Sequence, residues 1–167
     1  MDNSSDSNNN FLRLSNGNLV NVTQILNNLY LGGIIYNWDD FKVFVQDKNI
    51  NAIVSIWDDS MINVTNLGLL PEDYLYVYIH DNQSANIMQY FDLLYNFIKR
   101  KMDEGKNVYV HCHAGISRSA TIVVYFIMKY CEISLSEAYQ LVLDKREIRP
   151  NQSFLLQLHM AESQMEF

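Results

Sequence analysis

One cysteine and one arginine, six positions apart, are the residues of this chain best placed to do chemistry. Cys112 and Arg118 stand in the run His-Cys-His-Ala-Gly-Ile-Ser-Arg-Ser-Ala of residues 111–120, with small residues between them. A cysteine thiolate is a strong nucleophile, and the planar guanidinium of arginine can hold two oxygens of one phosphate. The spacing therefore predicts a nucleophile beside an anion clamp.

The backbone between these two side chains can itself bind an anion. Gly115 lacks a Cβ and can adopt a positive φ, so the chain can curl until successive N–H groups face inward. The helix that follows adds the positive end of its dipole. The same field is expected to favour the thiolate of Cys112. The predicted phosphate-binding residues are His113, Ala114, Gly115, Ile116, Ser117 and Arg118.

Two neighbours of the loop have predicted supporting roles. The hydroxyl of Ser119 is placed to donate to the cysteine sulfur, and His111 is expected to pack and form hydrogen bonds behind the loop. Histidines on both sides of Cys112 could also suggest metal ligands. Adjacent residues of an extended chain point to opposite sides, however, and no second Cys/His pair completes a tetrahedral site. We therefore expect no metal and no other cofactor.

The elements that must position the loop alternate between strand and helix. An apolar strand, 107–111, precedes it, and a helix that is apolar nearly all round, 117–130, follows it. Further strands are predicted at 19–25, 29–31, 52–56 and 75–79, and further helices at 39–47, 87–104, 135–146 and 152–163. This order predicts an α/β fold with a mostly parallel central sheet of about five strands and helices on both faces. Cys112 then lies at the carboxyl end of a strand, where such folds bind ligands.

Length and charge limit the functions that need consideration. The chain has 167 residues and a net charge of −7, which favours one domain and argues against general binding to nucleic acid or to anionic membranes. Two cysteines and no apolar stretch of membrane-spanning length indicate a cytoplasmic protein, with the nucleus as the alternative. Residues 1–17 are predicted to form a disordered Asn/Ser-rich tail, and residues 18–167 the folded domain.

The run 111–119 resembles the signature loop of cysteine-based protein phosphatases, and residues 114–120 resemble its version in the dual-specificity branch. The run Leu-Tyr-Leu-Gly at 29–32 and the run Arg-Pro-Asn at 149–151 are similar to other parts of that family. The resemblance implies a small, atypical dual-specificity phosphatase domain, with its phosphate-binding loop between a strand and a buried helix.

The resemblance also implies a general acid, since an alkoxide or phenoxide leaves poorly without a proton. In the family this is an aspartate about thirty residues before the cysteine, and Asp81 occupies that place. Asp58 and Asp59 also follow a predicted strand but do not match the family position. Asn151 is expected to brace the loop. Arg149 is expected either to brace the loop or to be a surface residue at the start of a helix, and the sequence favours neither role.

The implied reaction is the hydrolysis of phosphotyrosine and phosphoserine or phosphothreonine proteins through a cysteinyl-phosphate, by a chain favoured to be a monomer. One alternative is a non-protein substrate, either a phosphoinositide or a nucleic-acid 5′-phosphate. Residues 113–117 contain no lysine, which the lipid-directed relatives tend to carry there. The other alternative is a catalytically weak phosphopeptide-binding module, although the cysteine, the arginine and the candidate acid are all present.

Overall fold

The computed structural model describes residues 10–166, and their centre is a five-stranded sheet. Its strands, in spatial order, are β3 (Val22–Leu26), β4 (Leu29–Gly32), β7 (Asn107–His111), β5 (Ile50–Trp57) and β6 (Tyr74–Tyr78). Only β3 and β4 pair antiparallel, and the other three pairs are parallel. The predicted mostly parallel sheet of about five strands is thus confirmed.

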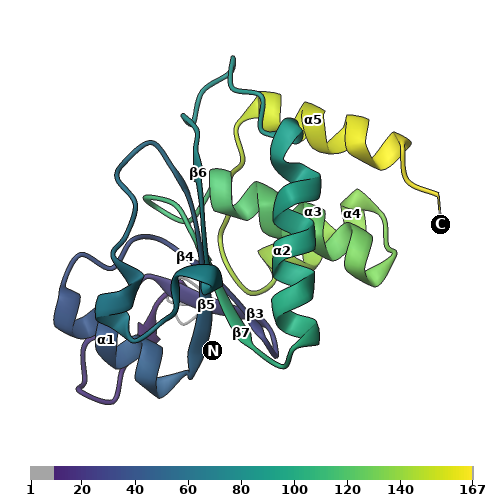
Figure 1. Ribbon diagram of the computed structural model, residues 1–167. Helices are drawn as coiled ribbons and strands as arrows, with labels where there is room; N and C mark the ends of the chain where they lie inside the picture. Colours follow the sequence, from purple (N-terminus) through teal and green to yellow (C-terminus); the bar gives the residue numbers. More distant parts are fainter. Residues whose placement is uncertain (1–9, 167) are drawn as a thin grey trace, which may run out of the picture.

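Helices cover both faces of this sheet, as predicted (Figure 1). One face carries α1 (Trp38–Asp47), whose Phe41 and Phe44 are fully buried. The helices on the other face are α2 (Phe91–Asp103), α3 (Arg118–Cys131), α4 (Leu135–Leu143) and α5 (Gln152–Ser163). Short 3₁₀ helices lie at Val64–Leu67 (η2), Pro71–Asp73 (η3) and Met88–Tyr90 (η4).

The strand and the helix on either side of the loop form the middle of the molecule. β7 lies between β4 and β5, and its residues Val108, Tyr109 and Val110 have no exposed surface. A parallel strand covered on both faces has this near-continuous apolar sequence. α3 is buried along nearly its whole length. Since both flanking elements are fixed by core packing, the loop between them has a rigid frame.

The predicted boundary of the N-terminal tail is wrong for residues 10–17. Leu12–Arg13 (β1) pairs antiparallel with Leu19–Val20 (β2), and the turn between them uses Gly17 at a φ of 90°. Leu14 is only 3% exposed, and it fixes this hairpin to the core on the α1 side of the sheet. The polar composition of the segment concealed this anchor. Residues 1–9 of the predicted tail lie outside the described residues.

Two helix ends also differ from the prediction. The segment predicted as a helix over 87–104 opens with the turn of η4, and α2 begins at Phe91. The capping box of Ser134 and Glu137 is present, but α4 ends at Leu143 rather than near Arg146. Arg146 leaves the helix because its side chain is bound behind the loop that follows β7, as described below. Within residues 10–166, no helix has the length and apolar character to cross a bilayer.

Candidate active site

Neighbouring elements hold the loop of residues 112–117 in place through hydrogen bonds to its backbone carbonyls. Each carbonyl accepts at least one hydrogen bond from a neighbouring element. The donors are His111 Nδ1 to Cys112 (3.0 Å), Ile34 N to His113 (3.0 Å), Asn21 Nδ2 and Arg146 Nη2 to Ala114 (2.9 and 3.1 Å), Arg146 Nε to Gly115 (2.8 Å), Arg149 N to Ile116 (2.7 Å) and Thr121 N to Ser117 (2.8 Å).

The backbone N–H groups of the loop face the other way. In a trans peptide the N–H points opposite to the preceding C=O, so carbonyls turned outward direct the amides inward. Among the described residues, the amides at positions 113, 114, 116 and 117 donate to no protein group. The amide of Gly115 donates to the sulfur of Cys112 at 3.2 Å. The loop therefore forms a concave set of donors around Cys112, as a nest for an anion requires.

Cys112 lies at the bottom of this nest. Its side chain is 2% exposed, and its Sγ lies 3.0 Å from the hydroxyl oxygen of Ser119. Ser119 is in the first turn of α3, so the positive end of that helix also faces the sulfur. The structure thus brings together the predicted nucleophile and the predicted hydroxyl donor.

Gly115 is required in the loop for two separate reasons. Its φ is +73°, a left-handed conformation that residues with a Cβ rarely adopt. A Cβ there would also lie 2.4 Å from the carbonyl carbon of Gly32 and 2.5 Å from Arg146 Nη2. A side chain at this position would therefore push the loop away from both of its supports.

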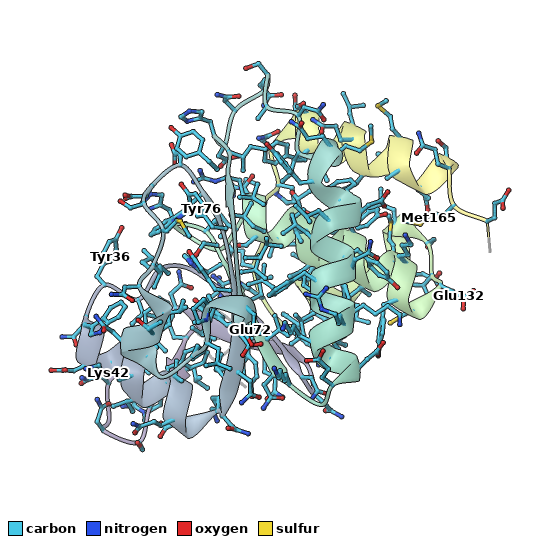
Figure 2. The ribbon with its side chains drawn as sticks, in the orientation of Figure 1. Tyr36, Lys42, Glu72, Tyr76, Glu132 and Met165 are labelled. Carbon is cyan, nitrogen blue, oxygen red and sulfur yellow. The ribbon has the colours of Figure 1, made fainter. Side chains whose placement is uncertain are left out.

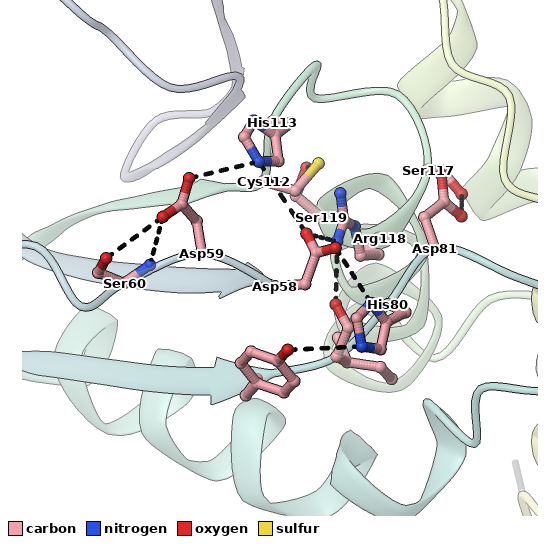
Figure 3. Close-up of polar contacts among 12 residues, drawn as sticks. Asp58, Asp59, Ser60, His80, Asp81, Cys112, His113, Ser117, Arg118 and Ser119 are labelled. Atoms are coloured by element: carbon pink, nitrogen blue, oxygen red, sulfur yellow. Dashed lines mark hydrogen bonds and ion pairs between the residues drawn. The ribbon is translucent and has the colours of Figure 1, made fainter.

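Arg118 opens α3 and turns its side chain across the nest (Figure 3). Its Nη1 donates to Asp58 Oδ1 at 2.8 Å and to the carbonyl of Ile79 at 2.9 Å. Its Nε is buried and has no hydrogen-bond partner among the described residues. An unpaired buried donor costs about 1–3 kcal/mol. A phosphate oxygen is an acceptor that would remove this cost.

The three candidate acids take different places. Asp81 Oδ1 accepts from Ser117 Oγ and from Asn151 Nδ2, both at 2.8 Å, so it is tied to the loop (Figure 3). Asp58 is instead paired with Arg118, whose hydrogen bond lowers the pKa of that carboxyl to about 2. Asp59 binds its neighbour Ser60 and lies 3.8 Å from His113 Nε2.

Asn151 contacts the loop and the candidate acid together. Its backbone N–H donates to Ser117 Oγ at 3.1 Å, its Nδ2 donates to Asp81, and its Oδ1 caps α5. The side chain of Arg149 is exposed, and this residue contacts the loop through its backbone N–H, which donates to Ile116 O. Both residues therefore contact the loop through their backbone N–H groups, and the Asn151 side chain binds the candidate acid instead.

His111 supports the loop from below through a chain of hydrogen bonds. Burial lowers the pKa of His111 to about 4, so the ring is neutral at pH 7. Because the carbonyl of Cys112 can only accept, His111 Nδ1 carries the proton and Nε2 accepts from Ser55 Oγ at 2.6 Å. Tyr74 then donates to Ser55 Oγ at 2.7 Å. The predicted position of His111 behind the loop is what the structure shows.

A neutral buried His111 predicts a loss of stability in mild acid. The unfolded chain binds a proton near the ordinary histidine pKa of about 6.5, whereas folded His111 stays neutral until about pH 4. Stability is thus present above the unfolded pKa and is lost as the pH falls toward the folded one. We expect the free energy of unfolding to fall by about 2 kcal/mol between pH 7 and pH 5. Urea denaturation at each pH measures the free energy of unfolding.

The matched variants for this experiment are two histidine substitutions. His111→Asn removes the buried ring and should remove most of the slope, whatever it does to overall stability. His159→Asn, at an exposed position of α5, should keep the wild-type slope. A wild-type unfolding free energy that stays level over this pH range would show that His111 is not held neutral.

Sequence reasoning missed Arg146, which supports the loop more extensively than any residue it predicted. The side chain is 1% exposed and binds two loop carbonyls. Its remaining hydrogen bonds go to Asn21 Oδ1 (2.6 Å), Thr23 Oγ1 (3.0 Å) and Asn10 O (3.2 Å). In sequence, Arg146 was indistinguishable from a solvated cation in the last turn of the predicted helix. Only its proximity to the Arg-Pro-Asn run hinted at a site.

Aromatic and histidine side chains border the opening of the loop. His113 is 39% exposed, and its ring centroid lies 4.9 Å from that of Trp57. The hydroxyl of Tyr36 lies 3.4 Å from His113 Nδ1, and the Tyr36 side chain stands out from the surface at 80% exposure (Figure 2). The rim next to the loop therefore offers an aromatic ring and an imidazole to an incoming molecule.

Comparisons with known proteins identify relatives of this chain. A family model described as the catalytic domain of dual specificity phosphatases matches residues 33–164. A protein of Amsacta moorei entomopoxvirus that carries a tyrosine-protein phosphatase name is 40% identical over 145 residues, which cover 86% of this chain and 88% of that protein. Dual specificity protein phosphatase 1 of Mus musculus is 35% identical over 143 residues, which cover 85% of this chain and 37% of the mouse protein.

Solved structures show the same fold. The crystal structure of the Cydia pomonella PTP-2 phosphatase superposes with a TM-score of 0.77 at 32% identity, covering 82% of this chain and 87% of that one. The crystal structure of the human tyrosine phosphatase-like serine/threonine/tyrosine-interacting protein gives a TM-score of 0.72 at 31% identity. The match covers 84% of this chain and 94% of the human one.

Proposed function

This chain belongs to the dual-specificity phosphatase family and is a protein phosphatase, and from that premise we propose that it hydrolyses phosphotyrosine and phosphoserine or phosphothreonine proteins through a cysteinyl-phosphate on Cys112. One observation carries this proposal. Every carbonyl of the loop is held outward, while the inward amides at four of its positions and Arg118 Nε have no protein partner within residues 10–166. These donors surround the sulfur of Cys112, where a tetrahedral phosphate would meet them.

In the first step, the loop amides and Arg118 bind the phosphoryl oxygens. The Cys112 thiolate attacks phosphorus in line, so an S–P bond forms while the P–O bond to the substrate breaks. Asp81 donates a proton to the departing oxygen. Since Asp81 Oδ1 already accepts two hydrogen bonds, we assign the transferred proton to Oδ2, which has no hydrogen-bond partner among the described residues.

In the second step, water replaces the sulfur. Asp81, now a carboxylate, takes a proton from the water as its oxygen attacks phosphorus, and the S–P bond breaks to release orthophosphate. The Ser119 hydroxyl, 3.0 Å from Sγ, supports the departing thiolate by donating a hydrogen bond. The proton taken up by Asp81 restores the acid for the next cycle, so the reaction needs no cofactor.

The proposed substrates carry a single phosphate on a protein side chain. The loop and the first residue of α3 together offer one arginine and no lysine, which suits one phosphoryl group better than a polyphosphorylated lipid headgroup. The rim of Tyr36 and His113 offers a ring surface to a phosphorylated side chain or its neighbours. Both features favour a phosphoprotein.

The proposal extends to the setting in which the protein acts. Cys112 and Cys131 are both free thiols, as expected in the reducing cytoplasm or nucleus. All the groups named in the two steps come from one chain, so a monomer suffices for the reaction.

A substrate panel tests this function. The wild-type protein is expected to hydrolyse an aryl phosphate, a phosphotyrosine peptide and a phosphothreonine peptide, with kcat/KM at least about 10-fold above that for a phosphoinositide in mixed micelles. Release of inorganic phosphate is measured for each, with Cys112→Ser protein from the same purification as the control. If the protein hydrolysed no aryl phosphate, the enzyme assignment would be overturned. If it preferred the phosphoinositide, the substrate would be the non-protein alternative.

A further inference from the structure

The Arg118 side chain is anchored by the ends of two neighbouring strands. Asp58 comes directly after β5 and Ile79 directly after β6, and these strands pair in parallel. Their acceptors meet at one atom, Arg118 Nη1, at 2.8 and 2.9 Å. The Arg118 side chain is only 8% exposed. Asp58 is therefore one of two groups that set the direction of this guanidinium.

Asp58 is itself held from its other side. Its Oδ2 lies 3.0 Å from Nδ1 of His80, while Oδ1 faces Arg118 (Figure 3). His80 in turn lies 3.5 Å from the hydroxyl of Tyr78. The carboxylate thus bridges an imidazole and the guanidinium, and neither of its oxygens is free to turn without losing a hydrogen bond.

The plane of the guanidinium makes this anchor relevant to phosphate binding. The five N–H groups of arginine lie in one rigid fork, so fixing Nη1 by two acceptors fixes the direction of the opposite edge. That edge contains Nε, a buried donor without a protein partner in the part of the chain that the structure describes. A guanidinium oriented in advance loses less side-chain freedom when a ligand binds.

We propose that Asp58 is a positioning residue, which holds Arg118 by Nη1 so that the Nε edge of the guanidinium is presented to the phosphoryl group. This inference rests on the proposed function, in which Arg118 is the phosphate ligand. Asp58 acts through Arg118 and does not touch the substrate. Its loss should weaken the binding of phosphate more than it slows the chemical step.

Any test must distinguish the effect of the negative charge of Asp58 on phosphate binding from the effect of its hydrogen bond to Arg118. The Arg118 hydrogen bond keeps the pKa of the Asp58 carboxyl near 2, so the group is an anion at neutral pH, close to the place where a phosphate dianion binds. Asp58→Asn removes the charge but keeps an oxygen that can accept from Arg118 Nη1. Asp58→Ala removes both. Comparing these two variants isolates the hydrogen bond, since they share one net charge.

The experiment measures inhibition by inorganic phosphate together with KM and kcat for an aryl phosphate. We expect Asp58→Ala to bind inorganic phosphate about 10-fold more weakly than Asp58→Asn, with KM raised to a similar degree and kcat changed by less than about 3-fold. The Asp58 side chain is a third exposed, so both variants should fold, and thermal melting checks this.

Asp59 supplies the matched control pair. It is 56% exposed, one residue further along the chain, and it makes no contact with Arg118. Asp59→Ala and Asp59→Asn should therefore bind phosphate equally. Equal phosphate binding by the two Asp58 variants would overturn the positioning role, and so would an effect confined to kcat. A wild-type protein without phosphatase activity would instead overturn the proposed function, so the two failures are distinguishable.

Discussion

Replacing Cys112 by serine is expected to lower turnover of an aryl phosphate by a factor of about 10⁴ or more while leaving phosphate binding intact. A serine hydroxyl is not ionised at neutral pH, and the nest around it stabilises an anion rather than abstracting a proton. The loop amides, Arg118 and the carbonyl anchors behind the loop do not depend on the sulfur. Steady-state kinetics measures the loss, and titration calorimetry with inorganic phosphate measures the binding that remains.

The second cysteine of the chain is the matched control for this variant. Cys131 is exposed at the far end of α3, about 20 Å along the helix from the loop by the usual rise per residue. Cys131→Ser should therefore retain wild-type turnover. Residual activity of Cys112→Ser within about 10-fold of the wild type would show that another group is the nucleophile.

Replacing Asp81 by asparagine is expected to lower kcat by about 10²–10³ on substrates with poor leaving groups, with little change in stability. Asparagine keeps an oxygen that can accept from Ser117 and Asn151, so the local hydrogen bonds can persist, but it has no proton to transfer. The effect should shrink when the leaving group is 4-nitrophenolate, which departs readily unprotonated. A series of aryl phosphates of graded leaving-group pKa measures this dependence.

Asp58 and Asp59 are the comparison residues for the acid. Asp58→Asn removes an ionised group that is paired with Arg118, and it should not reproduce the leaving-group dependence of Asp81→Asn. Asp59→Asn should resemble the wild type. If Asp58→Asn, and not Asp81→Asn, showed the large fall in kcat, the assignment of the acid to Asp81 would be wrong.

Much of this site was predictable because its central groups are contiguous in sequence. A strand, a small-residue loop and a helix within residues 107–131 place Cys112, Arg118 and Ser119 by local geometry alone, and the structure has those elements where they were predicted. The order of strands and helices likewise indicated a mostly parallel sheet, since helices alternate with strands along the chain and parallel strands need such crossover connections. Short-range patterns decide such features before any tertiary contact forms.

The supports of the loop were not predictable in this way. Arg146 was predicted only as the last residue of the helix over 135–146, and residues 10–17 were predicted to belong to a disordered tail. In the structure, that arginine instead joins the N-terminal strands to the loop carbonyls. Nothing in the spacing of Asn21, Thr23 and Arg146 marks them as neighbours, since more than 120 positions separate the first two from the third.

The sequence by itself determined the chemistry of this protein: a thiol, a guanidinium and a flexible glycine in one short loop between a strand and a helix. Only the tertiary structure decided the direction in which these groups point. It turned the loop carbonyls outward onto Arg146 and its neighbours and paired Asp58 rather than Asp81 with Arg118. It also left Nε of that arginine without a partner among the residues described. The physical reason is that hydrogen-bond direction depends on donors and acceptors far away in the chain, which meet only when the sheet has formed.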